Sequence, residues 1–269
     1  MVTGRTAIAV LGTAAICLTA CGSGGGNGAA PAAPPTVNGQ ATESPGTPGE
    51  RAAYSVKGQT IVLDPGHNGG PLKGTQVFVG NGYKACDTSG TSTNAGYTEH
   101  AFTWDVAKRT QKLLEQRGAK VFLTRDNDKG SGPCVDERAK IGNDKKAGAV
   151  ISIHADGAAA SGHGFHIIAP KPVPGYNEKI VKPSLRLAKD IRASYRNETG
   201  MPYATYLGDG KGLTIRDDLG GLNLSTVPKI FIETGNMRNK GDAAKLSDPK
   251  FRQKIAVSLA DGLDKYFKN

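Results

Sequence analysis

Four short runs of β-branched and aliphatic residues are the feature that most constrains the fold of this chain. They occupy residues 61–63, 119–124, 149–153 and 229–232. Each is too short for a buried helix and ends at turn-forming or polar residues, which is typical of strands buried in a sheet. Helical patterns lie between the runs, and this alternation predicts a single α/β domain with a mostly parallel central sheet of about six strands flanked by helices.

The remaining elements are expected from the same patterns. Helices are expected at four places, from Glu99 to Gly118 and over residues 136–146, 182–199 and 248–267. A further strand is expected over residues 164–169. Residues 68–98 are rich in Gly, Asn, Thr and Ser, with residues 75–79 as their only candidate strand, and a loop of this length is expected to shape a site. Residues 200–227 are rich in Gly and are expected to be irregular.

The beginning of the chain has the composition of an export segment. Residues 1–21 combine one basic residue, Arg5, with a short apolar run, which is the layout of a secretory signal. The run closes on Leu-Thr-Ala-Cys, ending at Cys21, and this resembles the lipobox of bacterial lipoproteins. The resemblance implies that Cys21 carries a lipid. The alternative is an ordinary cleaved signal peptide in which Cys21 has no role.

A second change of composition follows the export segment. Residues 22–52 consist mainly of Gly, Ala, Pro, Ser, Thr and Asn without an apolar period, which predicts a flexible tether. The predicted folded domain therefore spans residues 53–269. We expect it to be exported and held at the outer face of the cytoplasmic membrane.

Cysteine usage and charge agree with export. Cys86 and Cys134 are the two cysteines beyond the export segment, and in an oxidising compartment they are expected to form a disulfide. Neither lies in a Cys-x-x-Cys spacing, so a metal site is the less favoured alternative. The net charge of +10, or +9 without Arg5, is scattered over the chain. We expect attraction to anionic envelope polymers, no nucleic-acid partner, and a monomer.

Ionisable side chains follow three of the predicted strands. His67 comes after the first strand and the turn-forming sequence Asp-Pro-Gly, His154 directly after the third, and Glu233 directly after the last. Because the carboxyl ends of neighbouring parallel strands lie at one edge of a sheet, these side chains are expected to converge there. Glu99 stands at the start of a predicted helix.

This combination of residues points to metal-assisted chemistry. Two histidines and a carboxylate are a known ligand set for catalytic zinc, which keeps its fourth position for water. A second carboxylate nearby then serves as general base. The spacing alone leaves open whether Glu99 or Glu233 is the ligand.

Four motifs, in order along the chain, resemble those of the zinc-dependent N-acetylmuramoyl-L-alanine amidases of the type-3 family. They are Asp-Pro-Gly-His ending at His67, then Glu99, Ser-Ile-His-Ala-Asp around His154, and Ile-Glu-Thr-Gly-Asn around Glu233. The likeness covers residues 58–266. The cysteine pair and the segment Pro-Cys-Val-Asp-Glu-Arg resemble in particular the mycobacterial and related actinobacterial cell-wall amidases, which lack a wall-binding module.

The resemblance implies a ligand set and an activity. His67, Glu99 and His154 would hold Zn²⁺, and Glu233 would be the catalytic carboxylate. The implied reaction is hydrolysis of the amide bond between N-acetylmuramic acid and L-alanine, in peptidoglycan or muramyl peptides, during cell-wall turnover and daughter-cell separation. Arg216 is expected near the site, where its guanidinium would bind a peptide carboxylate.

Several neighbouring residues have more than one interpretation. His100 is a rival ligand, but adjacent residues point about 100° apart on a helix, so only one of the pair can face the site. His163 and His166 either support the site or are surface or packing residues. Asp64 and Asp156 either orient the histidines through hydrogen bonds or simply form turns.

Two other functions remain open at this point. The chain could be a non-catalytic wall-binding lipoprotein that has kept the fold, or a metallopeptidase that cuts within the stem peptide. No helical insert that would occlude the site is evident in the sequence. We therefore expect an enzyme that is not autoinhibited by such a segment.

Overall fold

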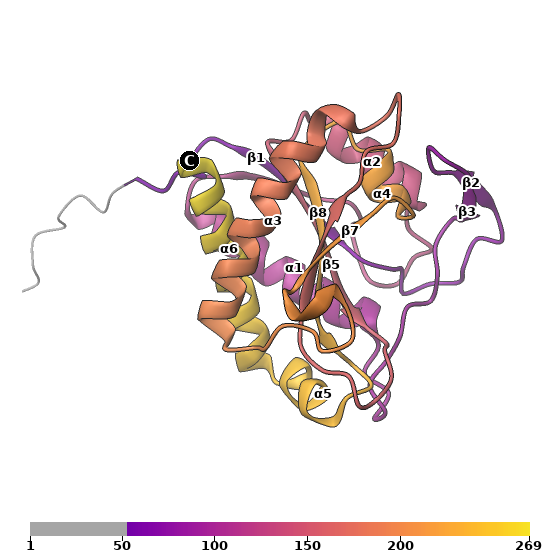
Figure 1. The fold of residues 1–269 in the computed structure, drawn as a ribbon, viewed down its shortest axis with the longest axis vertical. Helices are drawn as coiled ribbons and strands as arrows, with labels where there is room; N and C mark the ends of the chain where they lie inside the picture. Colours follow the sequence, from indigo (N-terminus) through magenta and orange to yellow (C-terminus); the bar gives the residue numbers. More distant parts are fainter. Residues whose placement is uncertain (1–52) are drawn as a thin grey trace, which may run out of the picture. The chain divides into compact units, whose positions relative to one another are not determined.

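A six-stranded sheet forms the centre of the structure, a computed structural model that describes residues 53–269 (Figure 1). The strands, in their order across the sheet, are β4 (Lys120–Leu123), β1 (Thr60–Pro65), β5 (Ala149–Asp156), β8 (Lys229–Asn236), β6 (His166–Pro170) and β7 (Leu213–Arg216). The predicted α/β sheet is thus confirmed. The predicted signal segment, Cys21 and the tether over residues 22–52 lie outside the described residues.

The sheet changes direction once. β4, β1, β5 and β8 run parallel, β6 pairs antiparallel with β8, and β7 runs parallel to β6. The carboxyl ends of β1, β5 and β8 therefore share one edge of the sheet with the beginning of β6. This edge carries the candidate site.

β7 corrects the expectation that residues 200–227 are irregular. The strand is a four-residue edge strand in which Leu213 and Ile215 alternate with polar residues, and Ile215 remains 49% exposed. Two apolar residues among glycines give only a weak strand pattern. The short helix α4 (Gly220–Asn223) also lies in this segment.

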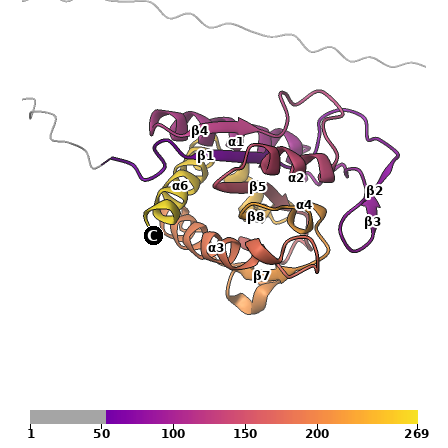
Figure 2. The same ribbon diagram turned by 90° about the horizontal axis from the view of Figure 1, so that it is seen from above.

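Helices cover both faces of the sheet. α1 (Glu99–Gln116), α3 (Glu178–Thr199) and α6 (Pro249–Lys268) pack on one face, while α2 (Val135–Asp144) and α4 pack on the other. In Figure 2, β5 and β8 lie between α6 on one side and α4 on the other. Within residues 53–269, none of the helices has the length and apolar character needed to cross a membrane.

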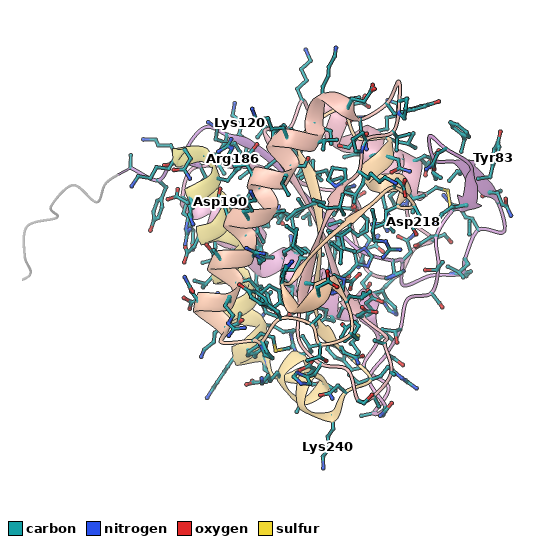
Figure 3. The ribbon with its side chains drawn as sticks, in the orientation of Figure 1. Tyr83, Lys120, Arg186, Asp190, Asp218 and Lys240 are labelled. Carbon is teal, nitrogen blue, oxygen red and sulfur yellow. A yellow bond between two sulfur atoms is a disulfide. The ribbon has the colours of Figure 1, made fainter. Side chains whose placement is uncertain are left out.

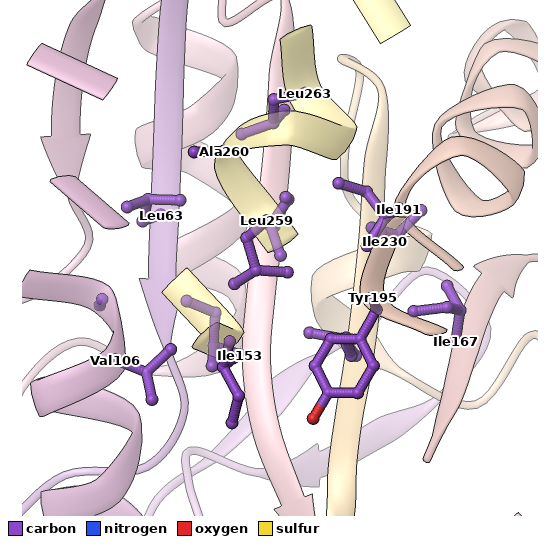
Figure 4. Packing of buried hydrophobic residues seen from close by; sticks show 14 of the residues in the cluster. Leu63, Val106, Ile153, Ile167, Ile191, Tyr195, Ile230, Leu259, Ala260 and Leu263 are labelled. Carbon is purple, nitrogen blue, oxygen red and sulfur yellow. The ribbon is translucent and has the colours of Figure 1, made fainter. Parts of the chain in front are cut away.

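The main core lies between the sheet and the first of these helical layers. Leu63, Ile153 and Ile230 of the sheet and Leu259 of α6 are fully buried there (Figure 4). Burial of one such side chain contributes about 1.5–3 kcal/mol. The hydroxyl of Tyr195 is also buried and donates to the carbonyl of Thr234 at 2.6 Å, which links α3 to β8. The strands that carry the site are therefore anchored in the core.

The structure differs from the predicted helices in one helix start and in one additional helix. α3 begins at Glu178 instead of 182 and contains Pro183, a residue that normally favours the first turn of a helix. The C-terminal helix is preceded by a separate helix, α5 (Lys240–Ser247), that was not predicted. Asp248 separates the two, and its carboxylate accepts a hydrogen bond from the Lys250 amide at 2.9 Å.

A small hairpin lies outside the main sheet. β2 (Gln76–Phe78) and β3 (Tyr83–Ala85) pair antiparallel, so the predicted strand at 75–79 exists but belongs to a separate sheet. The predicted disulfide between Cys86 and Cys134 is present and ties the end of the hairpin to the start of α2. Figure 3 shows Tyr83 projecting outward from this hairpin.

Candidate metal centre

Three side chains from different elements meet at the shared edge of the sheet. His67 follows β1, Glu99 is the first residue of α1, and His154 lies on β5. His67 Nε2 lies 3.1 Å from Glu99 Oε2, and His154 Nδ1 lies 3.0 Å from Glu99 Oε1. One ligand atom from each residue falls within 4.8 Å of the others. The structure thus brings together the three predicted ligands, and this group could hold a metal ion.

The backbone after β1 is shaped for this arrangement. A Cβ atom on Gly66 would come 2.2 Å from His154 Cε1, so only glycine leaves room for the imidazole. The next residue, His67, has a φ of 59°, a left-handed conformation that is uncommon for residues other than glycine. On its other side the His154 ring stacks on Phe231, with centroids 5.0 Å apart. The imidazole of His154 is therefore held between the backbone of Gly66, which has no side chain, and the ring of Phe231.

His67 is oriented by residues of the loop that the sequence did not single out. Its Nδ1 donates to the Thr88 carbonyl at 2.8 Å and lies 3.5 Å from Asp87 Oδ1. Burial opposes protonation of His67, but the hydrogen bonds to Asp87 and Glu99 outweigh it and raise its pKa to about 10. Because Nδ1 donates to the Thr88 carbonyl, Nε2 is the nitrogen that a metal would use after displacing its proton.

Glu99 is buried and held as a carboxylate. It accepts hydrogen bonds from the amides of Thr91 at 2.9 Å and Ala155 at 3.1 Å. Burial acts to raise its pKa, but the bonds from His154 and His67 prevail and lower it. Its neighbour His100 points elsewhere and pairs with Asp128 at 2.9 Å. The geometry therefore favours Glu99 over His100, as expected.

Within residues 53–269 Asp64 makes no hydrogen bond to His67 or His154, so the structure does not support the interpretation in which it orients the histidines. Its buried carboxylate accepts from Arg138 Nη1 at 2.8 Å and from Lys229 Nζ at 3.0 Å, as well as from the hydroxyls of Thr124 and Ser152. Burial would raise its pKa, but the charges of Lys229 and Arg138 hold it well below the usual range. Asp64 instead joins β1, β5, β8 and α2 beneath the site.

Asp156 fits the turn-forming alternative. Its Oδ1 accepts from the Gly157 amide at 2.8 Å, and within residues 53–269 it makes no hydrogen bond to His67 or His154. Among the other two histidines, His163 is partly exposed and His166 is buried.

Glu233 lies beside the candidate ligands and has the properties of a proton carrier. It stands opposite His154 in the parallel pairing of β5 and β8. Its Oε2 is buried and has no hydrogen-bond partner among the described residues. Burial and the charges of Glu99 and Asp156 raise its pKa well above the ordinary value. A carboxyl group whose pKa is raised holds a proton more readily than an ordinary glutamate does, which suits a group that takes up and releases a proton.

The four residues face a common cavity of about 330 Å³. Its walls also include Asp156, Ile168, Arg216 and Leu219. The guanidinium of Arg216 forms a two-point ion pair with Asp218, at 2.8 and 2.7 Å. Asp218, labelled in Figure 3, also lies 3.5 Å from Lys84 Nζ of the hairpin.

A second cavity of about 260 Å³ adjoins the first. The two share the walls formed by His67, His154 and Phe231. Lys84 and Ala85 of the hairpin and Val135 of α2 also line this second cavity. The hairpin and the start of α2 therefore line a cavity that adjoins the candidate metal centre.

Comparisons with known proteins agree with this arrangement. The sequence model of a family described as N-acetylmuramoyl-L-alanine amidase matches residues 61–265. An N-acetylmuramoyl-L-alanine amidase of Mycobacterium tuberculosis is 42% identical over 212 residues, which cover 78% of this chain and 86% of the relative. The crystal structure of an N-acetylmuramyl-L-alanine amidase from Mycobacterium smegmatis matches with a TM-score of 0.75 and 41% identity, covering 79% of this chain and 98% of that one. An apo-form amidase structure from Mycobacterium abscessus has a TM-score of 0.74 and 44% identity, covering 78% and 99%.

Proposed function

This chain belongs to the N-acetylmuramoyl-L-alanine amidase family, and on that premise we propose that it hydrolyses the amide bond between N-acetylmuramic acid and L-alanine. The observation that carries the proposal is the convergence of His67, Glu99, His154 and Glu233 on one cavity. The substrate is peptidoglycan or a muramyl peptide, and the place of action is the cell envelope. Cell-wall turnover and daughter-cell separation are the processes that such a reaction serves.

The proposed cofactor is Zn²⁺, held by His67 Nε2, Glu99 and His154 Nδ1. Two imidazoles and one carboxylate match the donor types of catalytic zinc sites and leave a coordination position open. When bound, zinc supplies Lewis acidity, which polarises a carbonyl group and makes water more acidic. Both His67→Ala and His154→Ala should lose the metal on dialysis, as measured by elemental analysis. Retention of zinc by either variant would remove that histidine from the ligand set.

Glu233 supplies the proton transfers. Its carboxylate takes a proton from the water that attacks the lactyl carbonyl carbon. When the bond from that carbon to nitrogen breaks, the same group returns the proton to the L-alanine nitrogen. The raised pKa of Glu233, caused by burial and by the charges of Glu99 and Asp156, suits a group that must hold a proton between these two events.

Arg216 is proposed to bind a carboxylate of the peptide. Two observations support this: it lines the same cavity as Glu233, and its two-point pairing with Asp218 has the bidentate form that a peptide carboxylate would use. A substrate carboxylate would replace Asp218. Arg216→Lys should then raise KM for a substrate that carries a free carboxylate more than for its amidated counterpart.

We further propose that the chain is a monomeric lipoprotein attached to the membrane at Cys21. The support is the lipobox-like sequence that ends at this residue. In a cell that makes the protein, the wild-type chain should sediment with membranes, whereas Cys21→Ser should be released as soluble protein. Equal distribution of both forms would contradict the anchor.

One experiment separates the proposed reaction from its alternatives. Zinc-loaded protein is incubated with muramyl dipeptide and with purified sacculi, and the released fragments are identified by mass spectrometry. The amidase predicts whole stem peptides and lactyl-bearing glycan. Cleavage within the stem peptide would indicate a metallopeptidase, and binding to sacculi without any release would indicate a wall-binding protein. Either of those outcomes contradicts the proposal.

A further inference from the structure

His166 stands beside Glu233 because the sheet changes direction at β6. The two residues are directly opposite each other in the antiparallel pairing of β6 and β8. Side chains of such a pair project from the same face of a sheet, with Cβ atoms about 4.5–5.5 Å apart. His154 stands opposite Glu233 on the other side. His154, Glu233 and His166 therefore form one row across three adjacent strands.

Three buried polar atoms in this region have no partner in the protein. Within residues 53–269, Glu233 Oε2, His166 Nδ1 and the Tyr206 hydroxyl make no hydrogen bond, although each atom is inaccessible to solvent. His166 as a whole is only 1% exposed. Its ring meets the ring of Tyr206 edge to face, with centroids 6.1 Å apart. Buried polar atoms are normally satisfied, so a cluster of unsatisfied ones needs an explanation.

The protonation states of the two neighbours complement a carboxylate. Burial lowers the pKa of His166 to about 4, against the raising effect of Asp156, so the imidazole is neutral and Nδ1 can accept a hydrogen bond. Burial, the charges of Asp156 and Glu233, and a contact of the hydroxyl with Asp156 that falls short of hydrogen-bond geometry raise the pKa of Tyr206, so its hydroxyl keeps its proton. The cluster thus offers one acceptor and one donor beside the Glu233 carboxylate.

We propose that His166 and Tyr206 are positioning residues for Glu233, and that the three side chains share one ordered water molecule. That water accepts a hydrogen bond from the Tyr206 hydroxyl and donates one each to His166 Nδ1 and Glu233 Oε2. Three hydrogen bonds are the usual number for a buried water. The contact fixes Oε2 in the protein and leaves Oε1 for the cavity that Glu233 lines. This inference rests on the proposed role of Glu233 as proton carrier.

The test uses substitutions that change single atoms of the cluster in the full zinc-loaded protein. Tyr206→Phe removes only the hydroxyl, and His166→Phe keeps a ring beside Tyr206 but removes both nitrogens. His166→Asn restores a polar amide atom at the position of Nδ1. We expect the two phenylalanine variants to lower kcat for release of lactyl glycan by about 10- to 100-fold, the range for groups that support a catalytic site through another residue. KM, zinc content and Tm should stay at the wild-type values, and His166→Asn should recover most of the lost kcat.

A matched control lies three residues before Tyr206. Tyr203 packs against Phe165, with centroids 5.4 Å apart, and does not line the cavity. Tyr203→Phe should therefore leave kcat unchanged. A readout independent of turnover is a high-resolution crystal structure, in which the Glu233 carboxylate should adopt one orientation in the wild type and in His166→Asn, and more than one in His166→Phe.

The outcomes separate this inference from the proposed function. If wild-type protein releases no lactyl glycan, the proposed function fails whatever the variants do. If the wild type is active and both phenylalanine variants keep kcat within twofold, the positioning role is wrong. Loss of zinc or of folding in His166→Phe, with no rescue by His166→Asn, would show that His166 is only a structural residue and would also overturn the proposal.

Discussion

The candidate site is built from two regions that are held in different ways. His154 and Glu233 lie on neighbouring strands whose backbone pairing sets the positions of their side chains. His67 lies in a left-handed turn at the start of the loop over residues 67–98, and its orientation depends on Thr88 and Asp87 of the same loop. The first region, which we term the strand half, is anchored in the core. The second, the loop half, is anchored by side-chain contacts and by one disulfide.

Substitutions in the two halves should therefore have different effects, on the stability of the whole domain in one and on local order in the other. A change beneath the strand half affects a buried network that joins β1, β5, β8 and α2, so it should reduce the stability of the whole domain. A change in the loop half should act locally, because few core residues lie in that loop. Four experiments test this difference.

The largest effect is expected from Glu233→Gln in the strand half. The substitution keeps the size of the side chain but removes the group that takes and returns the proton, and such groups contribute about 10²- to 10⁴-fold to a rate. We expect kcat for muramyl dipeptide to fall by that factor while zinc content and Tm remain unchanged. Retained turnover would remove Glu233 from the mechanism.

The next effect concerns stability. Asp64→Asn leaves the buried cations Lys229 and Arg138 without their carboxylate partner, which should cost about 3–5 kcal/mol of unfolding free energy in urea titrations. The folded-state pKa of Asp64 is depressed, so its contribution is present above the unfolded-state pKa and is lost as the pH falls through the folded-state value. In the control Asp144→Asn, an exposed pair with Lys140 is broken, and the change should be below about 1 kcal/mol. Similar losses for both variants would show that the buried network does not support the strand half.

Removal of the disulfide should act on the loop half. The bridge joins residues 48 positions apart in sequence and ties the end of the hairpin to the start of α2. In a Cys86→Ser, Cys134→Ser double variant, we expect faster hydrogen exchange at the paired amides of β2 and β3 and little change in those of β5 and β8. Equal acceleration in both regions would contradict the separation of the two halves.

The smallest effect is expected from Asp87→Asn. Thr88 continues to orient His67, so zinc affinity should fall only about tenfold, at the low end for loss of an outer partner of a ligand. In the wild type, zinc must displace a proton from His67, whose pKa is about 10, so affinity should rise with pH up to that value. Asp87→Asn lowers this pKa, so the rise in affinity should level off at a lower pH. Competition with a chromophoric chelator at several pH values measures both effects.

Much of the strand half could be predicted from the sequence. The runs before His154 and Glu233 are strongly apolar, and the rule that parallel strands end at one edge places both residues together. The same rule places His67 at this edge, because it follows the first strand. Glu99 could be assigned as a ligand only because its motif resembles that of a known family. The four side chains do converge in the structure, whereas their roles as ligands and proton carrier await the experiments above.

The contacts of the loop half and of the supporting residues could mostly not be predicted from the sequence. Asp87 lies in a polar stretch with no periodicity, and its contact with His67 exists only after the loop has folded back along the hairpin. The role of Asp64 was left open, and its pairing with Lys229 and Arg138 could not be predicted because proximity to His67 in sequence does not show which buried cations pack against a strand. His166 was left undecided because it precedes its apolar run, and only the reversal of β6 brings the start of that strand to the catalytic edge.

The alignment of His154, Glu233 and His166 across three strands also bears on how such a domain can change over evolutionary time. A single-residue insertion or deletion within β8 would turn Glu233 to the opposite face of the sheet and separate it from both histidines at once. A point substitution in β8 changes one side chain and can be reversed by one further substitution. A change in the length of β8 moves all the side chains that follow it, and no substitution of a single neighbouring residue restores them. Length variation among descendants of this chain should therefore accumulate in connections away from the site, such as residues 171–177, while the spacing within the strands is inherited intact.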